Sequence, residues 1–172
     1  DTSTLPSGNY RIDVHCHHIP DFYRLSLAQA GVVTAGGIPI PAWSPDMAVN
    51  FMNNYGIQMQ VVSISEPGVT HLTDRDARVA LAQQINDYTT ETLINGTGNL
   101  AGRFGGFAVL PLADPNDPVD VLNACAEATR AITVLGMDGV GILSNYKNIY
   151  LGDERLAPLM ATLNALGAMV FL

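Results

Sequence analysis

Three of the chain's four histidines fall within the sequence DVHCHH, residues 13–18. Side chains alternate between the two faces of a strand, so His15 and His17 are expected to point the same way, with Asp13 beside them. Two neutral imidazoles at the end of a strand can bind zinc or a similar divalent ion. A catalytic zinc site usually takes about three protein ligands and keeps one position open. The pair would supply two of these ligands.

The same spacing also fits surface histidines near a loop, but the end of the first strand of a βα series favours a metal site, because barrel enzymes keep their chemistry there. We expect His18 to leave the strand and face elsewhere. His71 follows the second strand in a long loop and is expected to be solvent-exposed rather than a ligand. Cys16, with Ile12 and Val14, is expected on the opposite face, toward covering helices, as a buried packing thiol.

Four further features are candidates for contact with a substrate. Trp43 precedes a helix start and would either line a substrate pocket or fill the loop. Asn145 and Tyr146 follow the fourth predicted strand and could reach a bound ligand, while Tyr146 could instead cover the rim of the sheet. The sequence EPG at residues 66–68 follows the second strand, where it would face the same site or form a plain turn.

The elements that must position these residues are five short apolar segments separated by helical patterns. The segments are rich in Val, Ile and Phe and mostly continuous, as expected for strands covered by helices. They span residues 11–16, 58–65, 103–110, 138–143 and 168–172. Strict alternation of strand and helix favours a parallel sheet with right-handed crossovers.

Helix boundaries are marked by capping residues. A helix is predicted to start at Ser44-Pro45-Asp46 and to stop at Gly56, and others to start at Thr73 or Asp74 and at Pro118. Extra loop is expected after the first two strands. Residues 31–42 predict an inserted hairpin that turns at two consecutive glycines.

Composition limits the class of protein. Hydrophobic residues make up 48% of the 172 residues and charged residues 14%, which excludes disorder and predicts one packed domain over residues 1–172. The formal net charge of −8 argues against binding to nucleic acid or anionic membranes. Cys16 and Cys125 are expected to be reduced thiols of a cytoplasmic protein. Residues 1–10 are expected to be a polar lead-in rather than a signal peptide.

Three segments carry a family resemblance: RIDVHCHHIP (residues 11–20), RFGGFAVLPLADP (residues 103–115) and residues 145–172. They resemble the amidohydrolase superfamily, in its ACMSD-like decarboxylase branch, and are most similar in type to 6-methylsalicylate decarboxylases. The resemblance implies a distorted (β/α)8 barrel that holds one divalent metal, zinc first and manganese second, at its C-terminal mouth. His15 and His17 match two of the family's metal ligands, and Asp13 is at most a support for them.

The resemblance also implies an activity, non-oxidative decarboxylation of a small hydroxylated aromatic carboxylic acid by a homodimer. The alternatives are a metal-dependent hydrolase that acts on a lactone or amide, and an inactive half-barrel scaffold. The family's remaining ligands, a His after the fifth strand and an Asp after the eighth, have no counterpart in these residues. A complete barrel needs ~250 residues. We therefore expect the N-terminal part of a TIM barrel, completed by a C-terminal half elsewhere or on another chain, or by a second copy.

Overall fold

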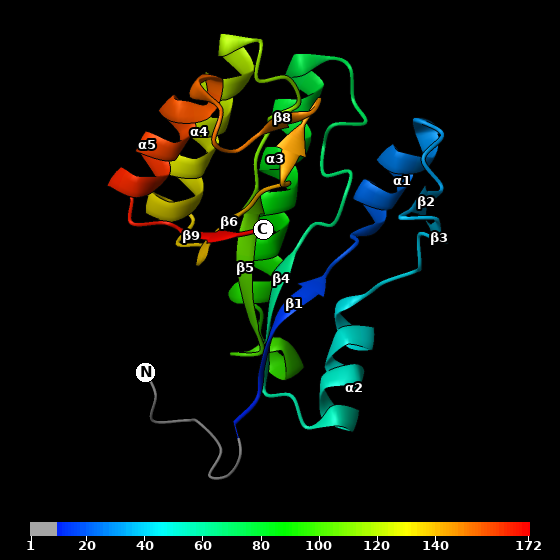
Figure 1. The fold of residues 1–172 in the computed structure, drawn as a ribbon. Helices are drawn as coiled ribbons and strands as arrows, with labels where there is room; N and C mark the ends of the chain where they lie inside the picture. Colours follow the sequence, from blue (N-terminus) through cyan, green and yellow to red (C-terminus); the bar gives the residue numbers. More distant parts are fainter. Residues whose placement is uncertain (1–9) are drawn as a thin grey trace.

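Five parallel strands form the central sheet of the computed structural model, which describes residues 10–172, in the order β1-β4-β5-β6-β9 (Figure 1). Their bounds are β1 (Ile12–His17), β4 (Met59–Ser63), β5 (Phe104–Val109), β6 (Gly139–Gly141) and β9 (Met169–Phe171). Four of them lie inside the predicted segments and β1 is shifted by one residue, so the predicted parallel α/β arrangement is confirmed. Apart from Tyr10, the predicted polar lead-in lies outside the described residues.

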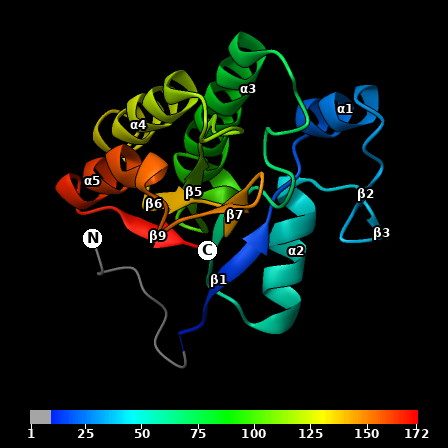
Figure 2. The same cartoon turned by 45° about the horizontal axis from the view of Figure 1, so that its top comes forward.

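Four helices pack around the outer side of this curled sheet, and the inner side stays open (Figure 2). They are α2 (Pro45–Tyr55), α3 (Arg75–Tyr88), α4 (Pro118–Thr133) and α5 (Ala157–Ala165). None of the helices among residues 10–172 combines the length and the apolar character needed to cross a membrane.

Capping side chains fix where these helices begin. The Ser44 hydroxyl, the Asp74 carboxylate and the Asp117 carboxylate each accept a hydrogen bond from a main-chain N–H in the first turn of α2, α3 and α4. Each such bond stabilises a helix by about 1 kcal/mol, because it satisfies an N–H that has no partner within the helix. Gly56 ends α2 in the left-handed conformation, with φ of +64°, which costs glycine little.

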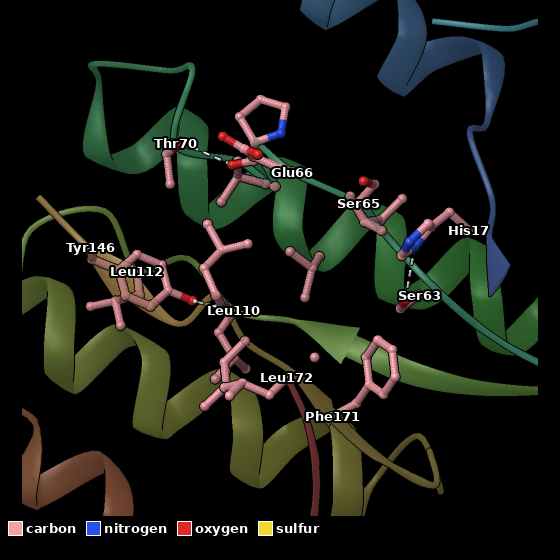
Figure 3. A pocket seen from close by; sticks show the side chains of 18 of the residues that line it. His17, Ser63, Ser65, Glu66, Thr70, Leu110, Leu112, Tyr146, Phe171 and Leu172 are labelled. Carbon is pink, nitrogen blue, oxygen red and sulfur yellow. Dashed lines mark hydrogen bonds between the residues drawn. The ribbon is translucent and has the colours of Figure 1, made fainter. Parts of the chain in front are cut away.

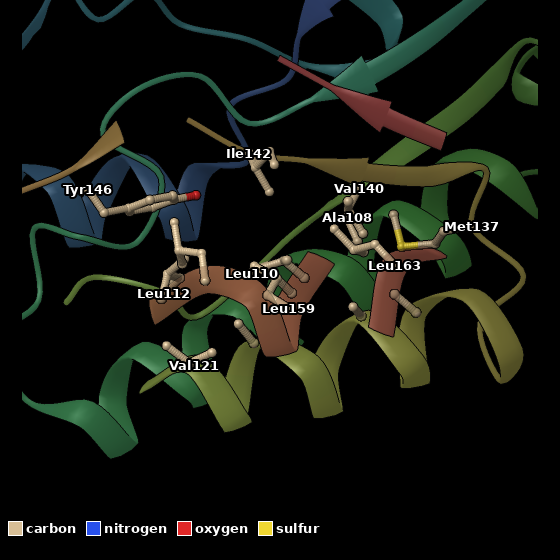
Figure 4. Packing of buried hydrophobic residues seen from close by; sticks show 14 of the residues in the cluster. Ala108, Leu110, Leu112, Val121, Met137, Val140, Ile142, Tyr146, Leu159 and Leu163 are labelled. Atoms are coloured by element: carbon tan, nitrogen blue, oxygen red, sulfur yellow. The ribbon is translucent and has the colours of Figure 1, made fainter. Parts of the chain in front are cut away.

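The largest apolar core lies between the outer face of β5 and β6 and the helices α4 and α5 (Figure 4). Ala108 and Val140 from the strands and Leu159 and Leu163 from α5 are all buried. The α4 side of this core is built from alanines, which are fully buried and let the helix approach the strands closely: Ala124, Ala128 and Ala131. This packing fixes the strands whose ends carry the candidate site.

The loop expected after β1 contains a helix that the sequence did not reveal, α1 (Asp21–Gln29). Its N-cap residue is Pro20, and no side chain caps the first turn, so the usual start signal is absent. The segment 31–42 contains the antiparallel pair β2 (Thr34–Ala35) and β3 (Ile38–Pro39). Together α1 and this hairpin stand beside the end of β1 (Figure 1).

Four further elements were not predicted. A second hairpin joins β7 (Asn145–Tyr146) to β8 (Ile149–Tyr150), and it turns at Lys147 and Asn148 with φ of +50° and +63°. Glycine, the usual signal for such a turn, is absent from it. Helix α3 continues as a π-helix, and two short 3-10 turns precede β5 and α5. These three segments are Thr89–Ile94, Gly98–Leu100 and Glu154–Leu156.

A β-bulge interrupts β1 and changes which side chains share a face. Asp13 pairs with Gln60 and Cys16 pairs with Val62, so residues 14–15 lie opposite a single residue of β4. Gln60 and Val62 are two positions apart and therefore face the same way. Asp13 thus shares the face of Cys16. The sequence expectation that Asp13 lies beside the histidine pair was wrong, because a bulge breaks the alternation.

Two of the three side chains expected to lie under the covering helices are exposed. Ile12 and Val14 are 47% and 54% exposed. Ile12 pairs with Met59, one position from Gln60, and so lies on the face opposite to Asp13 and Cys16. Cys16 is half-buried against the apolar cluster formed with α2. Burial, assisted by the nearby Asp13 carboxylate, raises the pKa of the Cys16 thiol to about 12. Of the three side chains, Cys16 packs as expected and the other two do not.

Candidate metal site at the carboxyl ends of the strands

The last residue of every strand in the central sheet lines one cavity of about 200 Å³, called here the sheet cavity. These five residues are His17, Ser63, Val109, Gly141 and Phe171. The carboxyl ends of parallel strands form the position where barrel and open α/β proteins bind ligands. The sheet cavity therefore lies where the fold favours a site.

His15 and His17 both line the sheet cavity, and their ring centroids are 5.3 Å apart with an interplanar angle of 80°. The rings of Phe171 and His15 pack in a T-shaped arrangement with 5.0 Å between their centroids, and Phe171 in turn stacks on Phe107. Two imidazoles this close offer two nitrogen donors to one cation. The Phe171 ring gives the pair an apolar neighbour within the cavity.

The imidazole of His17 is fixed by a partner in the next strand. Its Nδ1 atom lies 3.1 Å from Ser63 Oγ, as Figure 3 shows. Burial lowers the pKa of His17, so the ring is neutral at pH 7. With the hydrogen on Nδ1 and directed to the hydroxyl, Nε2 keeps a free lone pair, which is the arrangement of a metal-binding histidine.

Asp13 supports the backbone of the pair rather than a ring. Its Oδ1 accepts a hydrogen bond from the main-chain N–H of His15 at 3.1 Å, and its Oδ2 accepts one from Gln60 Nε2 at 3.2 Å. The carboxylate thereby holds the bulge in place. Its contribution to the position of His15 is indirect and acts through the main chain.

His18 leaves the strand and is 1% exposed. Its Nδ1 is 3.2 Å from the Ser63 carbonyl oxygen, and its Nε2 is 2.8 Å from Thr89 Oγ1 in the π-helix. Burial lowers its pKa to about 4, so the ring is neutral. A carbonyl oxygen only accepts, so Nδ1 carries the hydrogen. The Thr89 hydroxyl beside Nε2 also lies 2.8 Å from the Ile85 carbonyl oxygen, so its single hydrogen has two acceptors. His18 is consequently a structural residue behind the site.

The other residues singled out in the sequence lie at different places around the site. His71 is half-buried, with its Nε2 atom 2.9 Å from Ser26 Oγ and its ring packed against Tyr23. The expectation that His71 is exposed to solvent was therefore wrong. Tyr146 lines the sheet cavity across from His17 (Figure 3), and its hydroxyl accepts a hydrogen bond from the Leu143 N–H. Asn145 does not line that cavity.

Trp43 lines a different cavity, called here the hairpin cavity, which encloses about 230 Å³ between α1, the β2–β3 hairpin and the end of β1. The indole packs edge-on against the buried His18 ring, with 5.8 Å between centroids. His17, Ser65 and Glu66 line both cavities. The two cavities are therefore neighbours that meet at one of the candidate ligands.

Sequence reasoning missed several residues of the site. Ser63 and Ser65 interrupt an apolar strand at alternate positions, and this pattern could have indicated a strand face that turns toward a polar site. Thr89 gave no such signal, since it lies 71 residues from His18. Phe171 looked like an ordinary core residue of the last strand.

The described donors do not make a complete metal site by themselves. Within residues 10–172, no three His, Cys, Asp or Glu side chains come close enough together to hold an ion. The pair formed by His15 and His17 fits a divalent cation that also takes ligands from outside these residues or from a substrate. Neutral nitrogen donors suit zinc and manganese, although manganese also favours oxygen ligands.

The model of the amidohydrolase family matches residues 12–172. The chain belongs to the amidohydrolase family. The relatives of this amidohydrolase include the 6-methylsalicylic acid decarboxylases of Aspergillus aculeatus, 29% identical over 164 residues, and of Penicillium expansum, 27% identical. Each alignment covers 94% of this chain and 47% or 48% of the relative. The family resemblance read from the sequence is thus confirmed.

Solved structures give the same picture of the amidohydrolase fold. A crystal structure of an amidohydrolase II is 26% identical with a TM-score of 0.80, covering 93% of this chain and 49% of that one. A dihydroxybenzoic acid decarboxylase from Polaromonas, with bound manganese and 2-nitroresorcinol, has a TM-score of 0.71 at 23% identity, covering 96% and 49%. The chain spans about half the length of its relatives, and its five strands correspond to the N-terminal half of a TIM-barrel domain.

Proposed function

We propose that the protein containing this amidohydrolase chain catalyses the metal-dependent, non-oxidative decarboxylation of a hydroxylated aromatic acid. The observation that carries the proposal is the pair of imidazoles, 5.3 Å apart, in a cavity with aromatic walls at the strand ends. The names of two relatives supply the substrate class, since both relatives that match 94% of this chain are 6-methylsalicylic acid decarboxylases.

His15 and His17 would hold one divalent ion, zinc or manganese. When bound, the ion would grip the substrate carboxylate together with the neighbouring hydroxyl, which orients the acid and neutralises its charge. Support comes from the neutral state of His17 and from its contact with Ser63. The manganese in the related Polaromonas structure is a property of that protein and agrees with this assignment.

The remaining walls of the sheet cavity would receive the ring. Phe171, Leu110 and Leu112 give it an apolar lining, and Tyr146 closes the far side (Figure 3). Exclusion of water strengthens the charge interactions of a bound carboxylate. In the overall reaction the ring carbon gains a proton, the bond to the carboxylate breaks, and carbon dioxide leaves. The proton requires an acid, which neutral histidine ligands do not provide.

The test compares metal content and carbon dioxide release for the complete protein and its variants. His15→Ala and His17→Ala should each abolish bound metal and turnover of 2-hydroxybenzoates. His71→Ala is the matched control, because His71 lies outside the sheet cavity, and it should keep both. Normal turnover in either ligand variant would sink the proposal. Ring opening of lactones without carbon dioxide release would assign a hydrolase instead.

A further inference from the structure

The hairpin cavity is built almost entirely from apolar side chains. Tyr23 and Leu27 of α1 form its floor and are both 2% exposed. The Tyr23 hydroxyl donates a hydrogen bond to the Gly68 carbonyl at 2.8 Å, so its polar end is already satisfied and its ring adds apolar surface. The Trp43 indole packs against the buried His18 ring. Such walls do not favour a charged occupant.

The volume of the hairpin cavity fits a sizeable apolar group. An engineered cavity of roughly 150 Å³ with aliphatic and aromatic walls can bind benzene, and the hairpin cavity encloses about 230 Å³. A methyl group would leave most of this space unfilled. An alkyl chain of several carbons would use it.

The residues that line both cavities are where one molecule could occupy both. The shared lining contains the His17 imidazole and the Glu66 side chain. An acid with its carboxylate beside His17 could keep its ring in the sheet cavity and extend a substituent past this shared lining. The outer wall there is the hairpin, in which Ala35 pairs with Ile38.

We propose that the hairpin cavity is a subsite for an alkyl substituent of the aromatic acid, longer than a methyl group, and that Ala35 and Ile38 set its accepted length. This inference rests on the proposed function, because the decarboxylation site places the carboxylate at His17. It deepens that function by naming the substrates as alkylated hydroxybenzoic acids.

The experiment measures binding and decarboxylation of 2-hydroxybenzoate and its 6-methyl, 6-ethyl and 6-propyl derivatives by the metal-loaded complete protein. Each methylene that enters an apolar site should tighten binding about fourfold, which corresponds to ~0.8 kcal/mol. Calorimetric Kd values follow binding independently of turnover.

Two hairpin variants and a matched control test the location. Ala35→Leu occupies part of the cavity and should abolish the gain for the ethyl and propyl acids while leaving binding of 2-hydroxybenzoate unchanged. Ile38→Ala removes part of the wall and should weaken binding of the propyl acid. Thr34→Leu introduces the same side chain at the neighbouring position, which is exposed and does not line the cavity. This variant should show the same Kd values as the wild type for all four acids.

The outcomes separate this inference from the proposed function. If all four acids are decarboxylated but bind with equal Kd values, the alkyl subsite is overturned while the function stands. The same conclusion follows if Ala35→Leu still binds the ethyl and propyl acids more tightly than 2-hydroxybenzoate. Calorimetric affinity that increases with the length of the alkyl group, without carbon dioxide release, would support the subsite and overturn the function. If binding tightens along the series in the wild type and in Thr34→Leu but not in Ala35→Leu, and carbon dioxide is released, both the subsite and the function are supported.

Discussion

The hydroxyl of Thr89 lies 2.8 Å from Nε2 of His18, in a buried position that joins the π-helix to the end of β1. The other nitrogen of His18 contacts the Ser63 carbonyl oxygen, and the Ser63 hydroxyl contacts His17. A chain of three contacts therefore links Thr89 to a candidate metal ligand. Short π-helical segments often occur at functional sites. Here the π-helix supplies Thr89, which contacts His18 behind the two candidate ligands.

Thr89→Val should destabilise the protein by about 1–3 kcal/mol, because it keeps the shape of the side chain but leaves the buried Nε2 of His18 without a partner. Urea denaturation measures the change in the free energy of unfolding. Thr89→Ser retains the hydroxyl and should lose much less. Equal stability of the Val and Ser variants would show that the contact with His18 contributes nothing.

Ser63→Ala should weaken metal binding by about 10- to 100-fold, because the hydroxyl fixes the orientation and the tautomer of His17. Competition with a chelator of known affinity gives the metal Kd. Ser65→Ala is a suitable control, since Ser65 lines the same cavity and would change the Kd less. Identical metal affinity in wild type and Ser63→Ala would refute a supporting role for the hydroxyl.

Cys16 should resist alkylation in the native state. Its pKa is raised to about 12, first by burial and then by the Asp13 carboxylate, so at pH 8 the group is a neutral thiol. The thiolate is the reactive form, and a raised pKa keeps its fraction small throughout the neutral range. Labelling with iodoacetamide followed by peptide mass spectrometry should show slow modification of Cys16 until urea is added. Equally fast modification with and without urea would contradict the burial.

The ion pair between Arg78 and Asp120 should contribute strongly to stability. Arg78 Nη2 lies 2.7 Å from both carboxylate oxygens of Asp120, whose side chain is fully buried. Removing one partner of a buried pair leaves an uncompensated charge, so Asp120→Ala should cost about 3–5 kcal/mol. Thermal or urea unfolding measures this loss. Asp21→Ala breaks an exposed pair with Arg24 and should change stability little; a similar loss in both variants would rule out burial as the cause.

The sequence predicted those parts of the fold that depend on local chemistry. Ser44 and Gly56 bound α2 as expected, because a capping hydroxyl and a left-handed glycine act within one turn of the helix. The five strands were recognisable from their apolar runs. The helix α1 was missed because Pro20 offers no capping side chain.

The candidate site was predictable only in part. The two histidines stand out by their spacing, but the bulge in β1 depends on pairing with β4 and reverses the expected placement of Asp13. Ser63, Thr89 and Phe171 reach the histidines through tertiary packing. Such contacts join segments far apart in the chain, so strand periodicity does not reveal them.

The most direct test of the proposed activity is carbon dioxide release from 6-methyl-2-hydroxybenzoate by the complete protein, before and after removal of metal with a chelator. Release should stop when the metal is removed and return when manganese or zinc is added back. His17→Ala should not recover under the same conditions. Unchanged carbon dioxide release from protein shown to be free of metal would contradict metal-dependent decarboxylation.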